Sequence, residues 1–593
     1  MKTAKYKTAW DLTLFYKSLN DPQIEKDVVE AEKAYELFAK KYSKKQDYLK
    51  GGNPLLKILN DWEKLQETKF DLVFRYLHFI VDLDASNSKA QALNNVITAR
   101  ATAASNKVIF FELSLSKISK NMQKLIMADK RLSKYYYYLS LIFKTAQYNL
   151  SEKEEKILSL KSQPAHRMWV DAQGKFISSQ NITFKGREMS LAEAIDLRIT
   201  LGTKDRHALH KILIDRCKEI SFYSEAELSA IVTNKKTSDD LRGFKSPEEA
   251  TILSYQNEKK SVDNLVATTT KYFSVSHRFY KLKAKLMGVK QMSVADISAS
   301  VGKSLKKTNL DEAVTLIRES FTKADPEFRE MFDRMLEKGQ IDIYPKKGKK
   351  GGAYCSWSHN GPTVVLMNYV DSPRSVETLA HEMGHAIHGE LSKGQPILYE
   401  DCTTSVAEVA STFFENILFD HVFPSLPEKE KFFALFSHVQ DDISTVFRQI
   451  AFFNFEKEMH ATVSLKGAMS ADELAKTYAK HLKSYLGPAV GFQPNDGYGY
   501  VYVPHFRSFF YVYSYAYGQL ISKAMYGNFK KDPSFMTNVR KFLSAGSSMS
   551  PEDIFKSIGI DTSKPAFFED GLKSIEQDII ELEKLAKKAG MVK

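Results

Sequence analysis

One stretch, residues 378–388, constrains the fold of this chain more than any other. It reads Thr-Leu-Ala-His-Glu-Met-Gly-His-Ala-Ile-His and contains the pattern His-Glu-x-x-His. On a helix, His381 and His385 stand at positions i and i+4, so both imidazoles project from one face. Apolar residues recur at helical spacing around them, which predicts a partly buried helix. Ser372 followed by Pro373 predicts where this helix begins.

A buried helix with imidazoles and a carboxylate needs a partner for them, because unpaired polar groups are costly to bury. A metal ion is the simplest partner. Zinc is the expected ion, since neutral imidazole suits it and its geometry tolerates an open position. Glu382 lies about 100° round the helix from His381, given ~3.6 residues per turn. The sequence therefore predicts one zinc ion held by His381 and His385, with Glu382 beside it as a general base.

Catalytic zinc usually has three protein ligands, so a third must come from elsewhere. The metzincin pattern needs Gly and His where this chain has His388 and Leu391, so that pattern fails. We expect His388 to pack or to support a ligand. Glu408 is the better third ligand, because Glu415 recurs on the same helical face and could orient a ligand histidine. The alternative is that Ser405 and Glu408 form only a helix capping box.

A second stretch with chemical potential is 497–518, where glycines alternate with tyrosines around His505. Such a segment is typical of a mobile loop that closes on a ligand. Tyrosine hydroxyls and an imidazole can donate hydrogen bonds to a developing oxyanion. Tyr511 and Tyr515 would share one helical face. The alternation is equally compatible with a strand, and several of these tyrosines are expected only to pack.

Composition places the chain among ordinary globular proteins. It has 593 residues, 43% hydrophobic and 26% charged, which is long enough for more than one domain. The net charge of +13 raises the question of nucleic acid, but lysines are scattered among acids and no nucleic-acid motif is present. No apolar run reaches membrane-spanning length. The three widely spaced cysteines fit a reducing compartment. We therefore expect a cytoplasmic protein without nucleic-acid or membrane partners.

Helical periodicity dominates the chain, so we expect a mainly α fold organised in three regions. A helical region at 1–107 and a second at 108–187 precede the remainder, 188–593. The predicted N-terminal helices include 24–41, 70–84 and 88–107, and a strand-like piece at 175–184 marks the second boundary. Short strands at 341–344, 353–357 and 363–369 predict a small sheet beside the 378–388 helix. Its edge either pairs with an extended peptide or is purely structural.

Together these residues resemble family M3 of the zinc peptidases, in the oligoendopeptidase F branch. The segments that carry the resemblance are 348–355, 367–369, 379–386, 407–412 and 504–513. The resemblance implies a helical ellipsoid divided by a deep channel, with zinc at the channel floor. It implies that 108–187 is an oligopeptidase F-type helical domain and that 188–593 is the catalytic domain.

The resemblance also implies site roles. It makes His381, His385 and Glu408 zinc ligands and Glu382 the base, and it gives transition-state stabilisation to His505 and a following tyrosine, Tyr515 or else Tyr511. The predicted function is zinc-dependent endopeptidase cleavage of short unstructured peptides. The alternatives are a carboxypeptidase or dipeptidyl-trimming enzyme and a peptide-binding protein without turnover; an intact Glu382 argues against the second.

Overall fold

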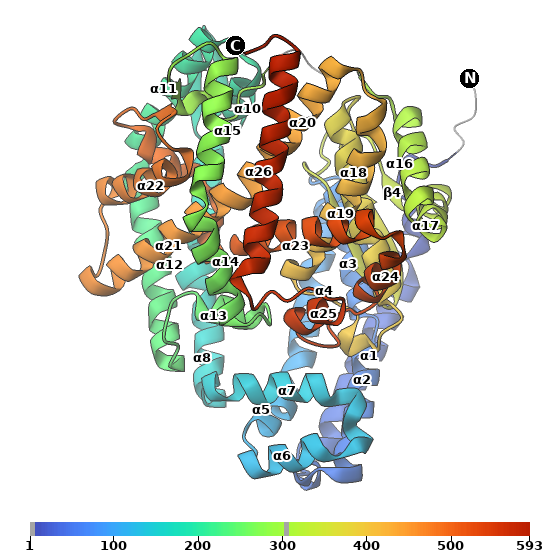
Figure 1. Ribbon diagram of the computed structural model, residues 1–593. Helices are drawn as coiled ribbons and strands as arrows, with labels where there is room; N and C mark the ends of the chain where they lie inside the picture. Colours follow the sequence, from blue (N-terminus) through green and yellow to red (C-terminus); the bar gives the residue numbers. More distant parts are fainter. Residues whose placement is uncertain (1–5, 302–306, 593) are drawn as a thin grey trace. The chain divides into compact units, whose positions relative to one another are not determined.

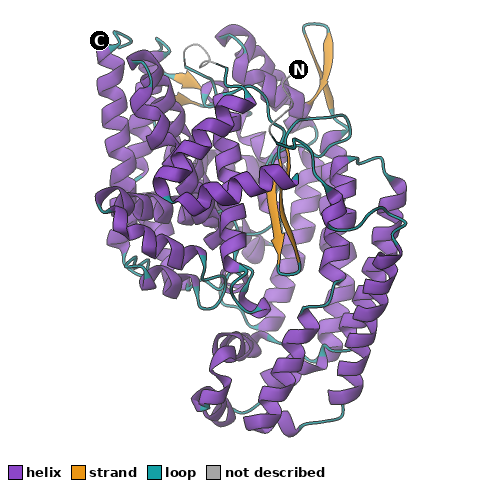
Figure 2. Ribbon diagram, turned by 90° about the vertical axis from the view of Figure 1, so that its right-hand side faces the viewer, coloured by secondary structure: helices purple, strands orange, loops and turns teal. Residues whose placement is uncertain are grey.

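The computed structural model describes residues 6–301 and 307–592, and it is mainly helical, as predicted (Figure 1, Figure 2). The chain divides into two units, each assembled from distant segments of the sequence. The first unit comprises Met1–Asn149, Lys306–Val422 and Met525–Gly559, and the second comprises Leu150–Leu305, Phe423–Ala524 and Ile560–Lys593. The three-region organisation stays a prediction, as does the ellipsoid with its channel.

The first unit contains the His-Glu-x-x-His helix. Its helices are α1 (Pro22–Tyr42), α2 (Gly52–Gln66), α3 (Phe70–Leu83), α4 (Ser88–Asn106), α5 (Phe110–Ser116), α6 (Lys120–Ala128), α7 (Tyr136–Thr145), α16 (Leu310–Ala324), α17 (Pro326–Lys338), α18 (Pro373–Ser392), α19 (Thr404–Val422), α24 (Met536–Leu543) and α25 (Pro551–Ser557). The three predicted N-terminal helices correspond to α1, α3 and α4. The start of α1 follows from local chemistry, because the Asp21 side chain caps it and Pro22 occupies its first turn.

A three-stranded sheet lies in the first unit, in the order β4–β6–β5. Strand β6 (Gly361–Leu366) runs parallel to β4 (Ile341–Asp342) and antiparallel to β5 (Tyr354–Ser358). The three strands predicted before the 378–388 helix are therefore present. Trp10 ties the N-terminal segment to this sheet, since its indole N–H donates to the carbonyl oxygens of Gln340 at 3.1 Å and Val365 at 2.8 Å.

The second unit is also helical. Its helices are α8 (Glu152–Ser162), α9 (Met168–Ser178), α10 (Leu191–Thr200), α11 (Thr203–Glu219), α12 (Ser221–Arg242), α13 (Glu249–Ser254), α14 (Lys259–Lys271), α15 (Phe273–Leu286), α20 (Glu428–Asp442), α21 (Gln449–Lys466), α22 (Ala471–Leu486) and α26 (Pro565–Lys588), and α23 (Tyr513–Lys531) continues from this unit into the first. Helices α14 and α15 lie alongside the long α26 (Figure 1).

The strand-like piece predicted at 175–184 is only partly correct. Residues up to Ser178 belong to α9, and the strand β1 is confined to Asn181–Phe184. It pairs antiparallel with β2 (Arg187–Ser190). In another two-stranded sheet, β3 (Met292–Ser293) pairs in parallel with β7 (Val490–Gly491). Across 6–301 and 307–592, no helix has both the length and the apolar character needed to cross a membrane.

Candidate metal centre

Helix α18 begins as the sequence predicts. The Ser372 side chain accepts a hydrogen bond from the Ser375 N–H, and Pro373 occupies the first turn. Further along, Gly384 allows α19 to cross closely, because a Cβ at this position would come within 2.7 Å of the Ser411 Cα. The glycine inside the His-Glu-x-x-His pattern thus brings the two helices together.

This crossing brings the three predicted ligands into one cluster. One ligand atom from each of His381, His385 and Glu408 lies within 4.8 Å of the others. The two imidazole rings are 4.9 Å apart and nearly perpendicular, and Nε2 of His381 lies 3.8 Å from a Glu408 carboxylate oxygen. Helix α19 begins at Thr404, one residue before Ser405, so the capping-box explanation of Glu408 does not hold.

Glu415 and Glu382 flank this cluster in different ways. A Glu415 carboxylate oxygen lies 2.6 Å from Nδ1 of His381, which leaves Nε2 of that ring to face Glu408. Glu382 is 6% exposed, and its Oε2 has no hydrogen-bond partner among the described residues. One acid therefore orients an imidazole, as predicted for Glu415, while the other keeps an unpaired oxygen.

The electrostatics of the cluster are those of crowded, buried groups. Burial raises the pKa of Glu382 to about 7 and also raises the pKa of Glu408. Burial lowers the pKa of His381, but the charge and hydrogen bond of Glu415, with the other nearby carboxylates, outweigh it and raise that pKa to about 9. Burial holds the pKa of His385 well below its usual range.

A comparison within the chain shows that the cluster fits a metal ion. In the second unit His438, Asp442 and Asp578 form a similar group of donors. There Lys523 supplies the cation, with Nζ 2.7 Å from Asp442 Oδ2 and 3.5 Å from Asp578 Oδ2.

The first cluster differs in that, within the described part of the chain, no lysine or arginine forms an ion pair with Glu408. In addition, Nδ1 of His385 is buried without a hydrogen-bond partner there. Two imidazoles and a carboxylate are also the donor set that zinc prefers.

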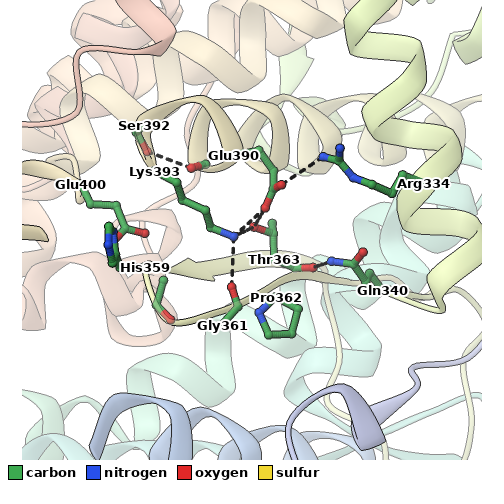
Figure 3. A network of polar contacts seen from close by, with 12 residues as sticks. Arg334, Gln340, His359, Gly361, Pro362, Thr363, Glu390, Ser392, Lys393 and Glu400 are labelled. Atoms are coloured by element: carbon green, nitrogen blue, oxygen red, sulfur yellow. Dashed lines mark hydrogen bonds and ion pairs between the residues drawn. The ribbon is translucent and has the colours of Figure 1, made fainter. Parts of the chain in front are cut away.

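A polar network fixes the C-terminal end of α18 to the β5–β6 hairpin (Figure 3). The Lys393 ammonium donates to the Gly361 carbonyl at 3.0 Å, to the Thr363 hydroxyl at 3.1 Å and to Glu390 at 2.6 Å. Arg334 of α17 donates to the other oxygen of Glu390 at 3.1 Å. Charge-assisted hydrogen bonds therefore hold the hairpin to α18, the helix that carries His381 and His385.

His388, one turn beyond the pair, lies outside the donor group. It is fully buried, with its ring 5.4 Å from the Phe542 ring and 6.3 Å from the Trp357 ring. Burial lowers its pKa to about 4. It packs as a neutral side chain, which is one of the two roles expected from the sequence.

The other predicted site residues belong to the second unit. The Tyr511 hydroxyl is hydrogen-bonded to Nδ1 of His505, and the Tyr515 ring lies 5.6 Å from the Tyr511 ring. Burial, with the charge of Arg448, lowers the pKa of His505 to about 4, so this imidazole is neutral near pH 7. Residues Asp496–Tyr502 and Pro504–Arg507 form 3₁₀ turns rather than a strand.

Sequence patterns did not identify the residues that hold this segment in place. Phe509 and Phe510 both have positive φ, at 41° and 59°, a strained conformation for aromatic residues. Glu456 accepts a hydrogen bond from the Phe510 N–H at 2.9 Å, and Arg507 pairs with buried Glu227 at 2.8 Å. An acid within the apolar run 450–456 was the available signal for Glu456.

The mainly helical fold and the His-Glu-x-x-His helix with its distant carboxylate define a metallopeptidase. More particularly, the chain belongs to peptidase family M3, whose family model matches residues 203–574, and the Oligopeptidase F model matches residues 115–177. It therefore lies in the oligopeptidase F branch, as the sequence indicated.

Sequence relatives of this chain align with it over most of its length. Oligopeptidase PepF of Bacillus subtilis is 26% identical over 550 residues, covering 90% of this chain and 81% of that protein. An oligoendopeptidase F homolog of Lactococcus lactis is 24% identical over 599 residues, covering 98% of each. The crystal structure of oligoendopeptidase-F from Enterococcus faecium matches with a TM-score of 0.71 at 22% identity, covering 95% of this chain and 99% of that one.

Proposed function

We propose that this chain is a zinc-dependent oligoendopeptidase that hydrolyses internal bonds of short, unstructured peptides. The convergence of His381, His385 and Glu408 beside Glu382 is the observation that supports this function. In the proposal these three ligands hold one zinc ion, and Glu415 orients the His381 ring through its Nδ1. When bound, zinc supplies a Lewis acid that acidifies water and polarises a carbonyl group.

Glu382 acts as the general base. A carboxyl whose pKa burial has raised to about 7 can both accept and return a proton near neutral pH. Its unpaired Oε2 takes a proton from the attacking water. The same oxygen then delivers that proton to the leaving amine nitrogen, so that the acid returns to its carboxylate form.

His505 and Tyr515 stabilise the oxyanion in this proposal, with Tyr511 as the alternative to Tyr515. A neutral His505 whose Nδ1 accepts a hydrogen bond from the Tyr511 hydroxyl carries its proton on Nε2, which can then donate a hydrogen bond to the oxyanion. The names of the relatives supply the substrate class, peptides of limited length cut internally. The cytoplasmic location and the absence of nucleic-acid and membrane partners stay predictions.

Cleavage of one defined peptide tests the function. A peptide of about ten residues with both ends blocked should be cut internally, and mass spectra of the products should show two fragments that a chelator prevents. A folded protein should survive the same treatment. Glu382→Gln should keep its zinc and lose ~10²–10⁴ in turnover, because it removes proton transfer. Stepwise loss of terminal residues from an unblocked peptide, or near-normal turnover by Glu382→Gln, would contradict the proposal.

Single tyrosine substitutions separate the two candidate oxyanion donors. Removing the true donor should lower kcat by ~10²–10³ while the bound zinc is unchanged. Tyr515→Phe is expected to do this, and Tyr511→Phe is the comparison. Tyr513→Phe is a matched control, since its hydroxyl donates to Asn257 at 2.9 Å. An equal kcat for the Tyr515 and Tyr513 variants would remove Tyr515 from the mechanism.

A further inference from the structure

A basic pocket lies beside strand β5 in the first unit. Its volume is about 460 Å³, and helices α3 and α4 and strand β5 line it. Arg75, His78 and Lys350 are among the lining residues, and none of the lining residues is acidic. Phe74 and Phe79 contribute apolar walls. A pocket with positive side chains and apolar walls suits an organic group that ends in a negative charge.

Arg75 is the most informative of these side chains. It is only 8% exposed. Its guanidinium donates to the Ser356 hydroxyl at 3.2 Å, the Ser358 hydroxyl at 2.6 Å, the Ser356 carbonyl at 2.9 Å and the Pro362 carbonyl at 3.0 Å. All of these acceptors are neutral, and Arg75 forms no ion pair with any carboxylate of the described residues. Asp71 and Glu400 act on Arg75 only at longer range, and burying a cation without a carboxylate at ion-pair distance is costly, so the pocket attracts an anion.

The other two basic side chains make longer contacts with an acid. Lys350 Nζ lies 3.4 Å from Asp82 Oδ1, and His78 Nε2 lies 3.5 Å from Asp82 Oδ2. Asp82 already accepts a shorter hydrogen bond, of 2.6 Å, from the Tyr354 hydroxyl. Both basic side chains are about half exposed, so each can turn toward a ligand. Asp82 can balance the charge of Lys350, whereas Arg75 has no ion-pair partner among the described residues.

The pocket faces one side of an edge strand. Side chains alternate along a strand, and those of Tyr354 and Ser356 meet α3, through Asp82 and Arg75. Trp357 faces α18 instead, where a Cβ on Gly389 would come within 2.5 Å of its ring. Only β6 pairs with β5 in the sheet as described. An extended peptide added to the free edge would also alternate, and every second side chain would point to the pocket side.

We propose that this pocket is a subsite for a carboxylate of a peptide bound along the edge of β5. The carboxylate is either an aspartate or glutamate side chain or the C-terminus of the peptide. The inference deepens the proposed peptidase function and depends on it. Lys350 and His78 provide mobile donors at the pocket wall, and Arg75 provides the fixed positive charge behind them.

Binding and cleavage of paired peptides test the subsite. Each pair differs only by Glu or Gln at one position, or by a free or amidated C-terminus. For zinc-loaded protein, the carboxylate form should be favoured by at least about tenfold in kcat/KM in one of these pairs. The Glu382→Gln variant should show the same ratio in Kd by fluorescence anisotropy. The pair that shows the effect identifies the source of the carboxylate.

Charge-reversal variants test whether this pocket causes the carboxylate preference. For each variant, the measured quantity is the ratio of kcat/KM for the carboxylate peptide to that for its neutral pair. Lys350→Glu should bring the carboxylate preference to one or below. Lys347→Glu makes the same charge change three residues away, outside the pocket lining, and should keep the wild-type ratio. A ratio near one in every wild-type pair overturns the subsite, and so does an equal effect of the two variants. A preference in Kd without cleavage of any peptide would leave the subsite standing and contradict the peptidase function instead.

Discussion

Two clusters of acidic and imidazole side chains in this chain differ in how the negative charge of their carboxylates is balanced. In the second unit, His438, Asp442 and Asp578 surround a cation that the chain itself provides, the ammonium of Lys523. In the first unit, the cluster that includes Glu408 has similar donors, but no lysine or arginine of the described residues lies within ion-pair distance of Glu408. Acid and imidazole clusters alone therefore do not identify a metal site. What distinguishes the candidate metal site is that its donors converge and that, among the described residues, no lysine or arginine pairs with its carboxylate ligand.

The largest effect expected from this contrast is the loss of the metal in the first cluster. Glu408→Gln keeps the size of the side chain but removes one of the three proposed zinc ligands. Zinc should fall from one ion per chain to near zero after dialysis against a weak chelator, and peptide cleavage should fall to background. Metal content measured by mass spectrometry checks this.

Glu390→Gln is the matched control for this change. Glu390 lies on α18, but its carboxylate binds Lys393 and Arg334. This variant should therefore keep its zinc. Full zinc content in Glu408→Gln would mean that the third ligand is a different residue.

The second cluster should respond in stability rather than in metal content. Lys523→Met leaves Asp442 and Asp578 without their buried cation, and breaking such a pair costs about 3–5 kcal/mol. The free energy of unfolding, measured with urea, should fall by that amount while the zinc content stays at one. Excess zinc should restore part of the loss, since the vacated donors resemble the first cluster.

Lys530→Met is the control for the lysine substitution. Lys530 lies on the same helix, α23, and pairs with Asp420 at 2.6 Å, but its side chain is 65% exposed. An exposed pair contributes about 0–1 kcal/mol. If both lysine variants lost equally little stability, Lys523 would not be the cation that stabilises the second cluster.

Sequence patterns predicted the helix-based features because those features are local. The boundaries of α1 and α18 follow from caps and prolines within a few residues, and the pairing of His381 with His385 follows from helical periodicity. Sequence patterns offered Glu408 as a candidate ligand, but its convergence with the two histidines depends on the close helix crossing that Gly384 permits, which a local pattern does not contain.

Features set by distant residues were not predictable in the same way. The strand-like piece at 175–184 was ambiguous, since a short apolar run fits the end of a helix as well as a strand. The turns around His505 depend on Glu227 and Glu456, which lie far away in the sequence. The cluster around Lys523 likewise joins three helices, α20, α23 and α26.

The smallest effect belongs to Glu415, which contacts a proposed zinc ligand, His381, rather than the proposed metal position. Its carboxylate lies 2.6 Å from Nδ1 of His381 and accepts a hydrogen bond from the N–H there, so in the proposal Nε2 is left to bind zinc. Glu415→Gln can still contact the ring, but it no longer supplies a charge to make the imidazole a stronger ligand. Zinc affinity should fall by ~10–100-fold, as for other residues that orient a metal-bound histidine.

A competition with a metal-sensitive dye measures this affinity, and the activity of the zinc-saturated variant separates the two possible roles. If Glu415 only orients and polarises His381, saturating zinc should restore most of kcat for Glu415→Gln. If kcat stays low at full occupancy, Glu415 also acts on the reacting groups. An unchanged zinc affinity would show that the cluster holds its metal without the Glu415 carboxylate, which would make the first cluster simpler than its hydrogen bonds indicate.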